Sequence, residues 1–374
     1  HRDLHSFPTR RSSDLYVYNL YNNTAGNIFA ENNLWGTFNL DSVEMGIFHF
    51  IDNSSLGTVD YSPIYYPPFE YVTPGTGINW DLASLASNSG GVVVKIGNQY
   101  HFLKYVTISA TDTITIATPD TLLFADTMPL IVYGVLNITS PQKVLFSALD
   151  TLKPWDYLAA FNLSHPLRNA IIEHGKGLYL KDANTRVENC IFRKNHIADG
   201  AALEIDSESG AILVENNVFE NNYGRALFSY HNAHPKIQNN IFAGNVNNDT
   251  LVPQITLSVE NDTCYLNDNI ITGGGANAGG IYIYKTGDTT AVIVMENNQL
   301  ANNRYGIAAE GSKIKTIIAG NIVENNKNEQ ILETGFAFYF NGENKHYVEL
   351  KNNIVRNNNW GILLDGNVFA NVGV

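Results

Sequence analysis

The chain has 374 residues, enough by length for two domains, and 16% of them are charged. Its 36 Asp and Glu against 23 Lys and Arg give a formal net charge of −13. This acidic balance argues against nucleic acid as a partner, because surfaces that bind nucleic acid are basic. No apolar stretch approaches the ~20 residues of a membrane-spanning helix, so we expect no membrane span in the chain.

Residues 1–15 share neither composition nor period with the rest of the chain. The run from Ser6 to Leu15 matches the translation of a common sequencing adapter, so we treat 1–15 as an artefactual, adapter-like segment outside fold reasoning. Residues 16–69 follow. They contain the run from Gly26 to Asn33, a phrase in which asparagines flank two apolar residues.

Prolines and glycines between residues 67 and 75 indicate a linker, and a short helix is predicted near residues 80–87. The run from Asn79 to Ala86 offers a helix N-cap and an apolar face at i, i+2, i+3 and i+6. We expect this helix to cover the open end of the following domain, where unpaired strand edges would otherwise meet water. Residues 70–88 are therefore assigned to a linker and a capping helix.

The asparagine phrase recurs through residues 89–374, in copies spaced 27, 23, 29, 29, 23 and 32 residues apart. The copies begin at Asn189, Asn216, Asn239, Asp268, Asn297, Gly320 and Asn352. A glycine-led run of alternating apolar and polar residues precedes nearly every copy, with Pro253 where one glycine would stand. A period in the twenties with alternation inside each unit predicts one short supersecondary unit stacked many times.

Each unit holds two alternating stretches that are too short for ordinary helices, and we predict that they are strands. One unit would close into a triangular turn, and successive turns would pair in parallel about 4.8 Å apart. Asparagine tolerates the left-handed backbone of a tight bend, and its amide can bond to the amides one turn above and below. Cys190 stands where the next copies have asparagine, and a small buried residue can substitute there.

These repeats resemble the right-handed parallel β-helix, the pectin-lyase-like architecture of many secreted bacterial proteins. The resemblance covers roughly residues 100–374 and implies an all-β solenoid. Upstream of that range, the runs Asn33 to Gly36 and Val59 to Pro63 resemble the closing turn and exit strand of an array in β-helix proteins of this kind. Residues 16–69 would then be the C-terminal end of an upstream β-helix, and 89–374 a second one, truncated at its C-terminus. We expect a secreted or cell-surface protein, monomeric within a longer chain.

The two cysteines are predicted to be free. Cys190 and Cys264 lie about three coils apart, roughly 14 Å at 4.8 Å per coil. A disulfide requires α-carbons within about 7 Å, so both thiols are expected to be structural.

The outward side chains of the glycine-led strands are the predicted ligand-binding surface. Turn by turn they are expected to be Tyr179 and Lys181, Glu204 and Asp206, Ser229 or His231, Tyr282 and Tyr284, Glu310, Tyr339 and Asp365. Tyrosine rings stack on the apolar faces of sugars, while carboxylates accept hydrogen bonds from hydroxyls. Tyr179, Tyr282, Tyr284 and Tyr339 are therefore the candidate polysaccharide-binding residues. The alternative is that tyrosine simply suits an exposed strand position.

Glu204 and Asp206 are the candidate catalytic pair, with Lys181 as the basic group beside them. Two residues apart on one strand, the carboxylates would lie on the same side and about 7 Å from each other, within reach of the spacing used by inverting glycosidases. One would need a raised pKa to donate a proton while the other activates water. The alternative is a solvated acidic turn, because Glu208 and Gly210 follow closely.

Glu188 and Glu215 are the candidate metal ligands. They are expected to stack on adjacent turns, where like charges repel unless a cation or a basic group lies between them. In an extracellular protein, a calcium ion bound between the two carboxylates would offset this repulsion. The resemblance to pectate lyases supports such a calcium site. Arg193 lies near in sequence, but a surface pair with Glu220 explains it as well.

His231 and His234 lack further ligands at zinc spacing, which favours a pair of loop histidines. We predict a non-catalytic, exported β-helix module of a larger surface protein, a spacer or adhesin that contacts polysaccharide, with no cofactor besides the calcium considered above. The alternative is a polysaccharide lyase or glycoside hydrolase acting around Glu204, Asp206 and Lys181.

Overall fold

The computed structural model describes residues 18–31, 33, 40–62, 70–197, 200–207, 212–230, 234–247, 251–274, 277–285, 287–327, 334–340 and 346–372. The adapter-like segment 1–15, the predicted closing turn at 34–36 and His231 therefore lie outside the described residues. The chain divides into two compact units, His1–Pro68 and Phe69–Val374.

The first unit contains two parallel strand pairs and one short helix. Its elements are β1 (Leu20–Tyr21), β2 (Ile28–Phe29), α1 (Leu40–Met45), β3 (Ile47–Phe48) and β4 (Val59–Asp60). Strand β1 pairs with β3 and β2 with β4, both in parallel. A small core forms around Val43, Ile47 and Val59. The asparagine phrase near residue 28 thus does supply a strand; its assignment to an upstream β-helix stays a prediction.

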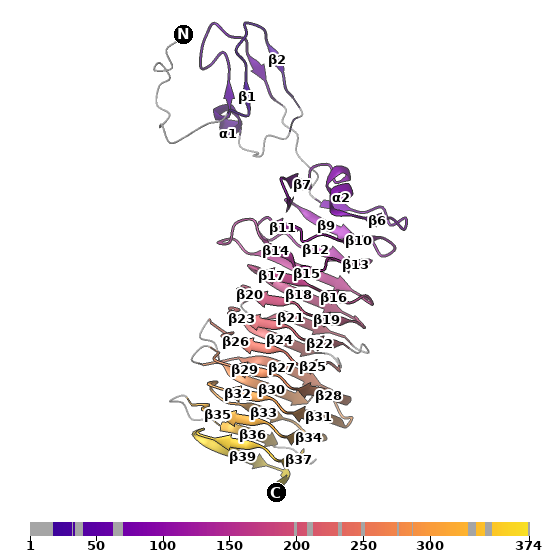
Figure 1. The fold of residues 1–374 in the computed structure, drawn as a ribbon, viewed down its shortest axis with the longest axis vertical. Helices are drawn as coiled ribbons and strands as arrows, with labels where there is room; N and C mark the ends of the chain where they lie inside the picture. The colour runs from indigo at the N-terminus through magenta and orange to yellow at the C-terminus, as the bar shows by residue number, and fades with distance from the viewer. Residues whose placement is uncertain are drawn as a thin grey trace. The chain divides into compact units, whose positions relative to one another are not determined.

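The second unit is a solenoid built of three long faces, which we call sheets I, II and III, and Figure 1 shows their strands stacked one above the next. Sheet I contains β5 (Glu70–Val72), β9 (Tyr105–Ile108), β12 (Leu130–Val132), β15 (Trp155–Phe161), β18 (Gly175–Lys181), β21 (Ala201–Asp206), β24 (Arg225–Tyr230), β27 (Pro253–Val259), β30 (Gly279–Lys285), β33 (Ile307–Glu310), β36 (Thr334–Phe340) and β39 (Trp360–Gly366).

Sheet II contains β16 (Leu167–Arg168), β19 (Arg186–Glu188), β22 (Leu213–Glu215), β25 (Lys236–Gln238), β28 (Asp262–Asn267), β31 (Ala291–Glu296), β34 (Ile314–Ala319), β37 (His346–Lys351) and β40 (Val368–Val372). Sheet III contains β7 (Val93–Ile96), β8 (Gln99–Phe102), β11 (Thr121–Phe124), β14 (Val144–Ala148), β17 (Ala170–Glu173), β20 (Ile191–Arg193), β23 (Val218–Glu220), β26 (Ile241–Ala243), β29 (Ile270–Thr272), β32 (Gln299–Ala301), β35 (Ile322–Glu324) and β38 (Ile354–Arg356). A short sheet of β6 (Asn79–Trp80), β10 (Thr113–Ile116) and β13 (Val135–Ile138) precedes sheet II.

Each coil runs from sheet I to sheet II to sheet III and back, as in the succession β18, β19, β20 and β21. The expectation of two strands per unit was wrong, because the asparagine phrase itself contains a bend. The bend separates a strand of sheet II from a strand of sheet III. The sheet III strand has three residues, which is too short to show an alternating pattern of its own. Neighbouring strands pair in parallel throughout the described sheets of this unit, except for the antiparallel pair β7–β8.

Two ladders of buried asparagines fix the register of the coils. In the first ladder, at the bend between sheets II and III, the backbone N–H and Nδ2 of Asn217 both donate to Oδ1 of Asn240, at 2.9 and 3.0 Å. The same pattern links Asn240 to Asn269, Asn269 to Asn298, Asn298 to Asn321 and Asn321 to Asn353. Its steps of 23, 29, 29, 23 and 32 residues are those of the sequence repeat.

The residue before each rung has the left-handed backbone of the bend. The two uses predicted for asparagine, the left-handed backbone and the amide ladder, therefore fall on adjacent residues. These positions have φ between +51° and +67° and are Asn189, Asn216, Asn239, Asp268, Asn297, Gly320 and Asn352. Cys190 is confirmed as a rung, since its backbone N–H donates to Oδ1 of Asn217 at 2.8 Å. Both Cys190 and Cys264 are free and buried, as predicted.

A second ladder lies at the other end of each sheet III strand, and it contains a substitute rung. Asn195, Asn222 and Asn245 are linked in the manner of the first ladder, as are Asn326 and Asn358. Asn303 is linked to Asn326 through its backbone N–H alone. Between Asn245 and Asn303 the coil has Gly274 at the rung position. Gln254, from β27, fills the gap: it accepts from Nδ2 of Asn245 and donates to Oδ1 of Asn303, each at 2.8 Å.

Apolar side chains fill the interior between the three sheets, in one continuous core. Phe192, Phe219 and Phe242 stack on adjacent coils, with ring centroids 4.7 Å apart at each step. The predicted capping helix is α2 (Leu82–Asn88), with Asp81 as its N-cap and Leu82 and Leu85 buried. It begins after Trp80, which belongs instead to strand β6.

Candidate functional site

The outward face of sheet I carries two parallel columns of side chains, and most predicted site residues lie on it. Tyr179 is in register with Glu204, and Lys181 with Asp206. Further along, Tyr284 is in register with Glu310, Glu310 with Tyr339 and Tyr339 with Asp365. The predicted stacking of these positions is therefore confirmed.

One coil of the predicted column was wrong. Ser229 is fully buried and in register with the interior residues Ile205 and Leu257. The outward positions of that coil are Phe228, beside Glu204, and Tyr230, beside Asp206. Outward residues of the glycine-led strands lie an even number of positions after the glycine, as Phe228 does after Gly224. Ser229 lies five positions after it, so the sequence interpretation was one residue out of phase.

Asp206 accepts two hydrogen bonds from the preceding coil. The phenol of Tyr179 donates to Oδ2 at 2.8 Å, and Nζ of Lys181 donates to Oδ1 at 3.0 Å. The structure thus brings together Lys181 and Asp206 with one of the tyrosines. Asp206 is the last residue of β21 and only 6% exposed, which contradicts the alternative of a solvated acidic turn.

Glu204 lies on the same strand and is also covered, at 9% exposure. Its Oε1 accepts a hydrogen bond of 3.0 Å from the backbone N–H of Ala201. Burial raises the pKa of Glu204 above its usual range, while the Ala201 amide and the charge of Arg225 oppose the rise. Burial likewise raises the pKa of Tyr179 to about 12. The two carboxylates therefore occupy different environments, as an acid and base pair would require.

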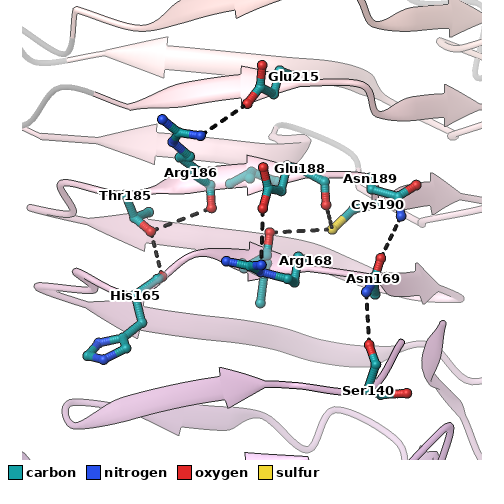
Figure 2. A network of polar contacts seen from close by, with 12 residues as sticks. Ser140, His165, Arg168, Asn169, Thr185, Arg186, Glu188, Asn189, Cys190 and Glu215 are labelled. Carbon is teal, nitrogen blue, oxygen red and sulfur yellow. Dashed lines mark hydrogen bonds and ion pairs between the residues drawn. The ribbon is translucent and has the colours of Figure 1, made fainter. Parts of the chain in front are cut away.

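The candidate calcium ligands lie on sheet II, where Glu188 and Glu215 are in register as predicted. Each faces an arginine, as Figure 2 shows: Nε of Arg168 lies 3.4 Å from Glu188, and Nη1 of Arg186 lies 3.7 Å from Glu215. Gln238 also donates to Glu215 at 2.9 Å. Basic side chains thus supply the positive charge that two stacked glutamates need, and the calcium site stays a prediction.

Arg193 has a local partner. Arg193 is in register with Glu220, but its Nε forms an ion pair of 2.6 Å with Glu173 on the preceding coil, so the expected partner was wrong. Among the described residues, no three His, Cys, Asp or Glu side chains are grouped so as to hold a metal ion.

A groove of about 420 Å³ lies on the same face of sheet I, on the coils that follow Glu204. Its aromatic walls are Phe228, Tyr282, Tyr284, Tyr305 and Tyr339. The depression arises because large and small residues share one column. Thr256 lies in register between Phe228 and Tyr282, and Ala308 and Ala337 follow Tyr282.

The groove walls are completed by the turns that lead from sheet III into sheet I. Tyr305 comes from the turn before β33, and its ring rests on the bare backbone of Gly279, where a Cβ would lie 2.2 Å from Cζ of the tyrosine. Leu251 and Val252 come from the turn before β27, and Pro253 begins that strand. Tyr282 and Tyr284 are stacked with centroids 5.8 Å apart, and the phenol of Tyr282 donates to Glu310 at 2.6 Å.

Three of the four predicted ligand-binding tyrosines line this groove, namely Tyr282, Tyr284 and Tyr339. Tyr179 does not, since it lies in the cluster with Asp206. The sequence interpretation missed Phe228, Tyr305 and the two arginines of the groove, Arg225 and Arg304. The turn residues carry no periodic signal. For Phe228 a signal was present, because counting alternate residues from Gly224 places Phe228 on the outward face.

One of three comparisons with known proteins found a match, and it agrees with the fold. The family profile described as "Right handed beta helix region" matches residues 164–323. A search of curated proteins found no match, and a search of solved structures found none either. Across the described residues, no helix has the length and apolar character to cross a membrane. The matched segment and the strands that extend it form an all-β, parallel solenoid, a right-handed β-helix.

Proposed function

We propose that this β-helix is a non-catalytic polysaccharide-binding module of an exported or cell-surface protein. The observation that carries the proposal is the aromatic groove on sheet I. Its rings belong to neighbouring coils, so they are spaced along one direction of a long, flat face. Aromatic rings in that arrangement can stack on successive sugar units while hydroxyls reach polar groups at the rim.

The fold alone favours no function, because β-helices host several. What favours binding over chemistry is the separation of the two features. The groove is lined by aromatic and small residues with two arginines, whereas Glu204 and Asp206 are covered and lie outside its lining. A polymer seated on the rings would therefore not lie on Glu204 and Asp206.

A glycan array probed with residues 70–374 would test this proposal. We expect binding to one class of polysaccharide, and a loss of affinity of about fivefold or more in the Tyr282→Ala and Tyr284→Ala variants, since a stacked ring contributes on the order of 1 kcal/mol or more. Tyr265→Ala is the matched control, because Tyr265 is 40% exposed on sheet II, outside the groove lining. Equal loss in all three variants, or no glycan bound, would contradict the proposal.

A second candidate function is hydrolysis or β-elimination of a polysaccharide at Glu204 and Asp206. It is favoured by one observation, the raised pKa of the buried Glu204 beside an Asp206 that is paired with Lys181. An assay for new reducing or unsaturated ends on the glycans that bind would decide between the two. Under the leading proposal no ends are released. Release that disappears in the Glu204→Gln variant would replace it with the enzymatic function.

A further inference from the structure

Resting on this proposed function, we propose that the groove selects a sugar bearing an anionic substituent, and that Arg225 and Arg304 neutralise that substituent directly, without a bridging metal ion. The shared chemistry is an oxyanion on a pyranose ring, supplied either by a carboxylate or by a sulfate ester. The groove as a glycan site could exist without this selectivity, so the two proposals are separable.

The charge of the groove differs from that of the chain. Over the whole sequence acidic residues outnumber basic ones by 36 to 23. Among the described residues that line the groove, the charged ones are Arg225 and Arg304, and none is acidic. A ligand that enters the groove therefore meets positive charge at short range, although it approaches a protein of negative net charge.

Both guanidinium groups are held against the aromatic walls. The guanidinium of Arg225 lies 5.3 Å from the ring centroid of Phe228, and that of Arg304 lies 5.0 Å from the ring centroid of Tyr305. Stacking fixes the plane of a guanidinium and leaves its edge to donate to a planar oxyanion in a bidentate manner. The groove thus offers apolar faces for a ring and oriented cationic edges for a substituent.

Arg304 is the better placed of the two to determine specificity. One terminal nitrogen donates to the backbone carbonyl of Leu251 at 3.2 Å, which ties the two turns of the groove together. Its Nε is buried and has no hydrogen-bond partner among the described residues, so a ligand would be bound by the terminal nitrogens. A guanidinium has five N–H donors, so Arg304 retains donors beyond those that position it.

Tyr305 lies within electrostatic reach of both arginines. Its phenol is buried, and the charges of both Arg304 and Arg225 act on it, opposing the rise in pKa that burial causes. The two arginines belong to coils three steps apart along sheet I. They could therefore each contact an anionic substituent on a different sugar unit, or both attract one substituent that lies between them.

Two acidic groups beside the groove have hydrogen-bond partners. Glu204 faces Arg225 from the preceding coil and accepts from the Ala201 amide. Glu310 accepts from the phenol of Tyr282 at the rim. These contacts hold the carboxylates beside the groove walls and leave the lining itself to the two arginines.

The test uses matched tetrasaccharides of glucose and of galactose, each in a neutral form, a form oxidised to the carboxylate at C6 and a form sulfated at C6. Titration calorimetry on the full chain should give affinity for one or both anionic forms that is about tenfold or more above the neutral form. Binding should be unchanged by EDTA and should weaken with added salt. Preference for the carboxylate or for the sulfate supports the proposal and identifies the source of the charge.

Variants separate the arginines from the rings. We expect Arg304→Gln and Arg225→Gln to lower affinity for the anionic form about fivefold or more and to leave the neutral form unchanged, with Arg304→Lys intermediate. Arg356→Gln is the control with the same charge change, since Arg356 lies on sheet III and pairs with Glu324. Thermal midpoints would show that each variant folds.

Three results would overturn the inference: equal affinity for neutral and anionic forms, loss of binding in EDTA, or equal effects of Arg304→Gln and Arg356→Gln. If ring variants abolish binding while the arginine variants do not, the groove binds glycans and only the anionic selectivity fails. If no glycan in the panel or on the array binds, the proposed function itself fails.

Discussion

Single residues decide where the groove lies, and Gly279 is one of them. A Cβ at this position would lie 2.2 Å from Cζ of Tyr305, so a methyl group would lift the ring away from its seat. The glycine is therefore required by a side chain of a neighbouring coil, even though its own φ is ordinary for any residue.

We expect Gly279→Ala to lower glycan affinity about tenfold or more while the solenoid stays folded, because the atoms nearest to the added methyl group belong to the far end of the Tyr305 side chain and not to the backbone. Gly361→Ala is the matched control, since its Cβ would meet nothing closer than Val355 Cγ1 at 3.9 Å. Titration of both variants against the bound glycan is the measurement. Equal affinity of the two variants would show that the position of Tyr305 is irrelevant to binding.

Cys190 is a rung without an amide. Its backbone N–H bonds to Asn217, but its thiol has only weak contacts with the carbonyls of Glu188 and Leu167, at 3.3 and 3.8 Å. An asparagine there could donate to Oδ1 of Asn217 on the next coil and to the Leu167 carbonyl on the preceding coil. Asn217 makes the equivalent pair of bonds with its own neighbours.

We predict that Cys190→Asn raises the free energy of unfolding by about 1 kcal/mol, the usual net contribution of one or two hydrogen bonds. Cys264→Asn should instead lower it by about 1–3 kcal/mol, because Cys264 lies in β28, away from both ladders, and the amide would be buried without a partner. Urea denaturation followed by circular dichroism measures both. A destabilised Cys190→Asn variant would show that the ladder is already complete at its first described rung.

At the scale of elements, the second ladder shows how a missing rung is replaced from another strand. Gln254 is fully buried and spans the gap between Asn245 and Asn303. It also donates to the Thr272 carbonyl at 3.3 Å. One longer side chain therefore substitutes for an asparagine that the intervening coil lacks.

Replacing Gln254 by leucine should cost about 2–4 kcal/mol, because it leaves buried amide groups of Asn245 and Asn303 unsatisfied on both sides. Gln299→Leu, exposed on β32 of sheet III, should change stability by less than about 0.5 kcal/mol. Hydrogen exchange of the amides of β26 and β32 would locate the effect. Unchanged exchange in the Gln254→Leu variant would mean that neighbouring water or backbone replaces the lost bonds.

The periodic elements could be predicted from the sequence, and the irregular ones could not. Asparagine spacing gave the ladder of Asn217, Asn240 and Asn269 because a buried amide must recur at the same place in each coil. Gln254 escaped prediction because it reaches the ladder from a different strand. Arg304 and Tyr305 escaped because they lie in turns of variable length, where only tertiary contacts fix the side chains.

For the candidate site, the same distinction holds. Tyr282, Tyr284 and Tyr339 were identified by alternation on exposed strand positions, which the backbone alone determines. The burial of Glu204 and Asp206 could not be predicted, since it depends on how neighbouring side chains such as Tyr179 and Tyr230 fold over them. Alternation gives the direction of a side chain and leaves its degree of covering open.

For the molecule as a whole, stability should depend on pH through His346, which is fully buried on β37. Burial lowers its pKa from 6.5 to about 4, and its Nε2 lies 2.9 Å from Thr316 Oγ1. The folded state therefore favours neutral histidine, whereas the unfolded chain binds a proton below its ordinary pKa. The stabilisation is fully present above pH 6.5 and is lost as the pH falls from 6.5 towards 4.

We predict that the free energy of unfolding falls over this pH window by up to roughly 3 kcal/mol through this histidine. The His346→Gln variant should show a weaker dependence between pH 6.5 and 4, because glutamine does not titrate. Thermal midpoints of both proteins across the window measure the difference. Parallel pH curves would show that His346 does not contribute, and that other groups cause any acid destabilisation.

One spacing is constant in every coil that carries both rungs: five residues separate the two ladders. The pairs are Cys190 and Asn195, Asn217 and Asn222, Asn240 and Asn245, Asn298 and Asn303, Asn321 and Asn326, and Asn353 and Asn358. All differences in coil length therefore arise in the two other corners. A peptide inserted at either of those corners would leave the spacing between coils unchanged, so the solenoid could display foreign loops on chosen coils. A single residue added between paired rungs would instead shift every coil beyond it.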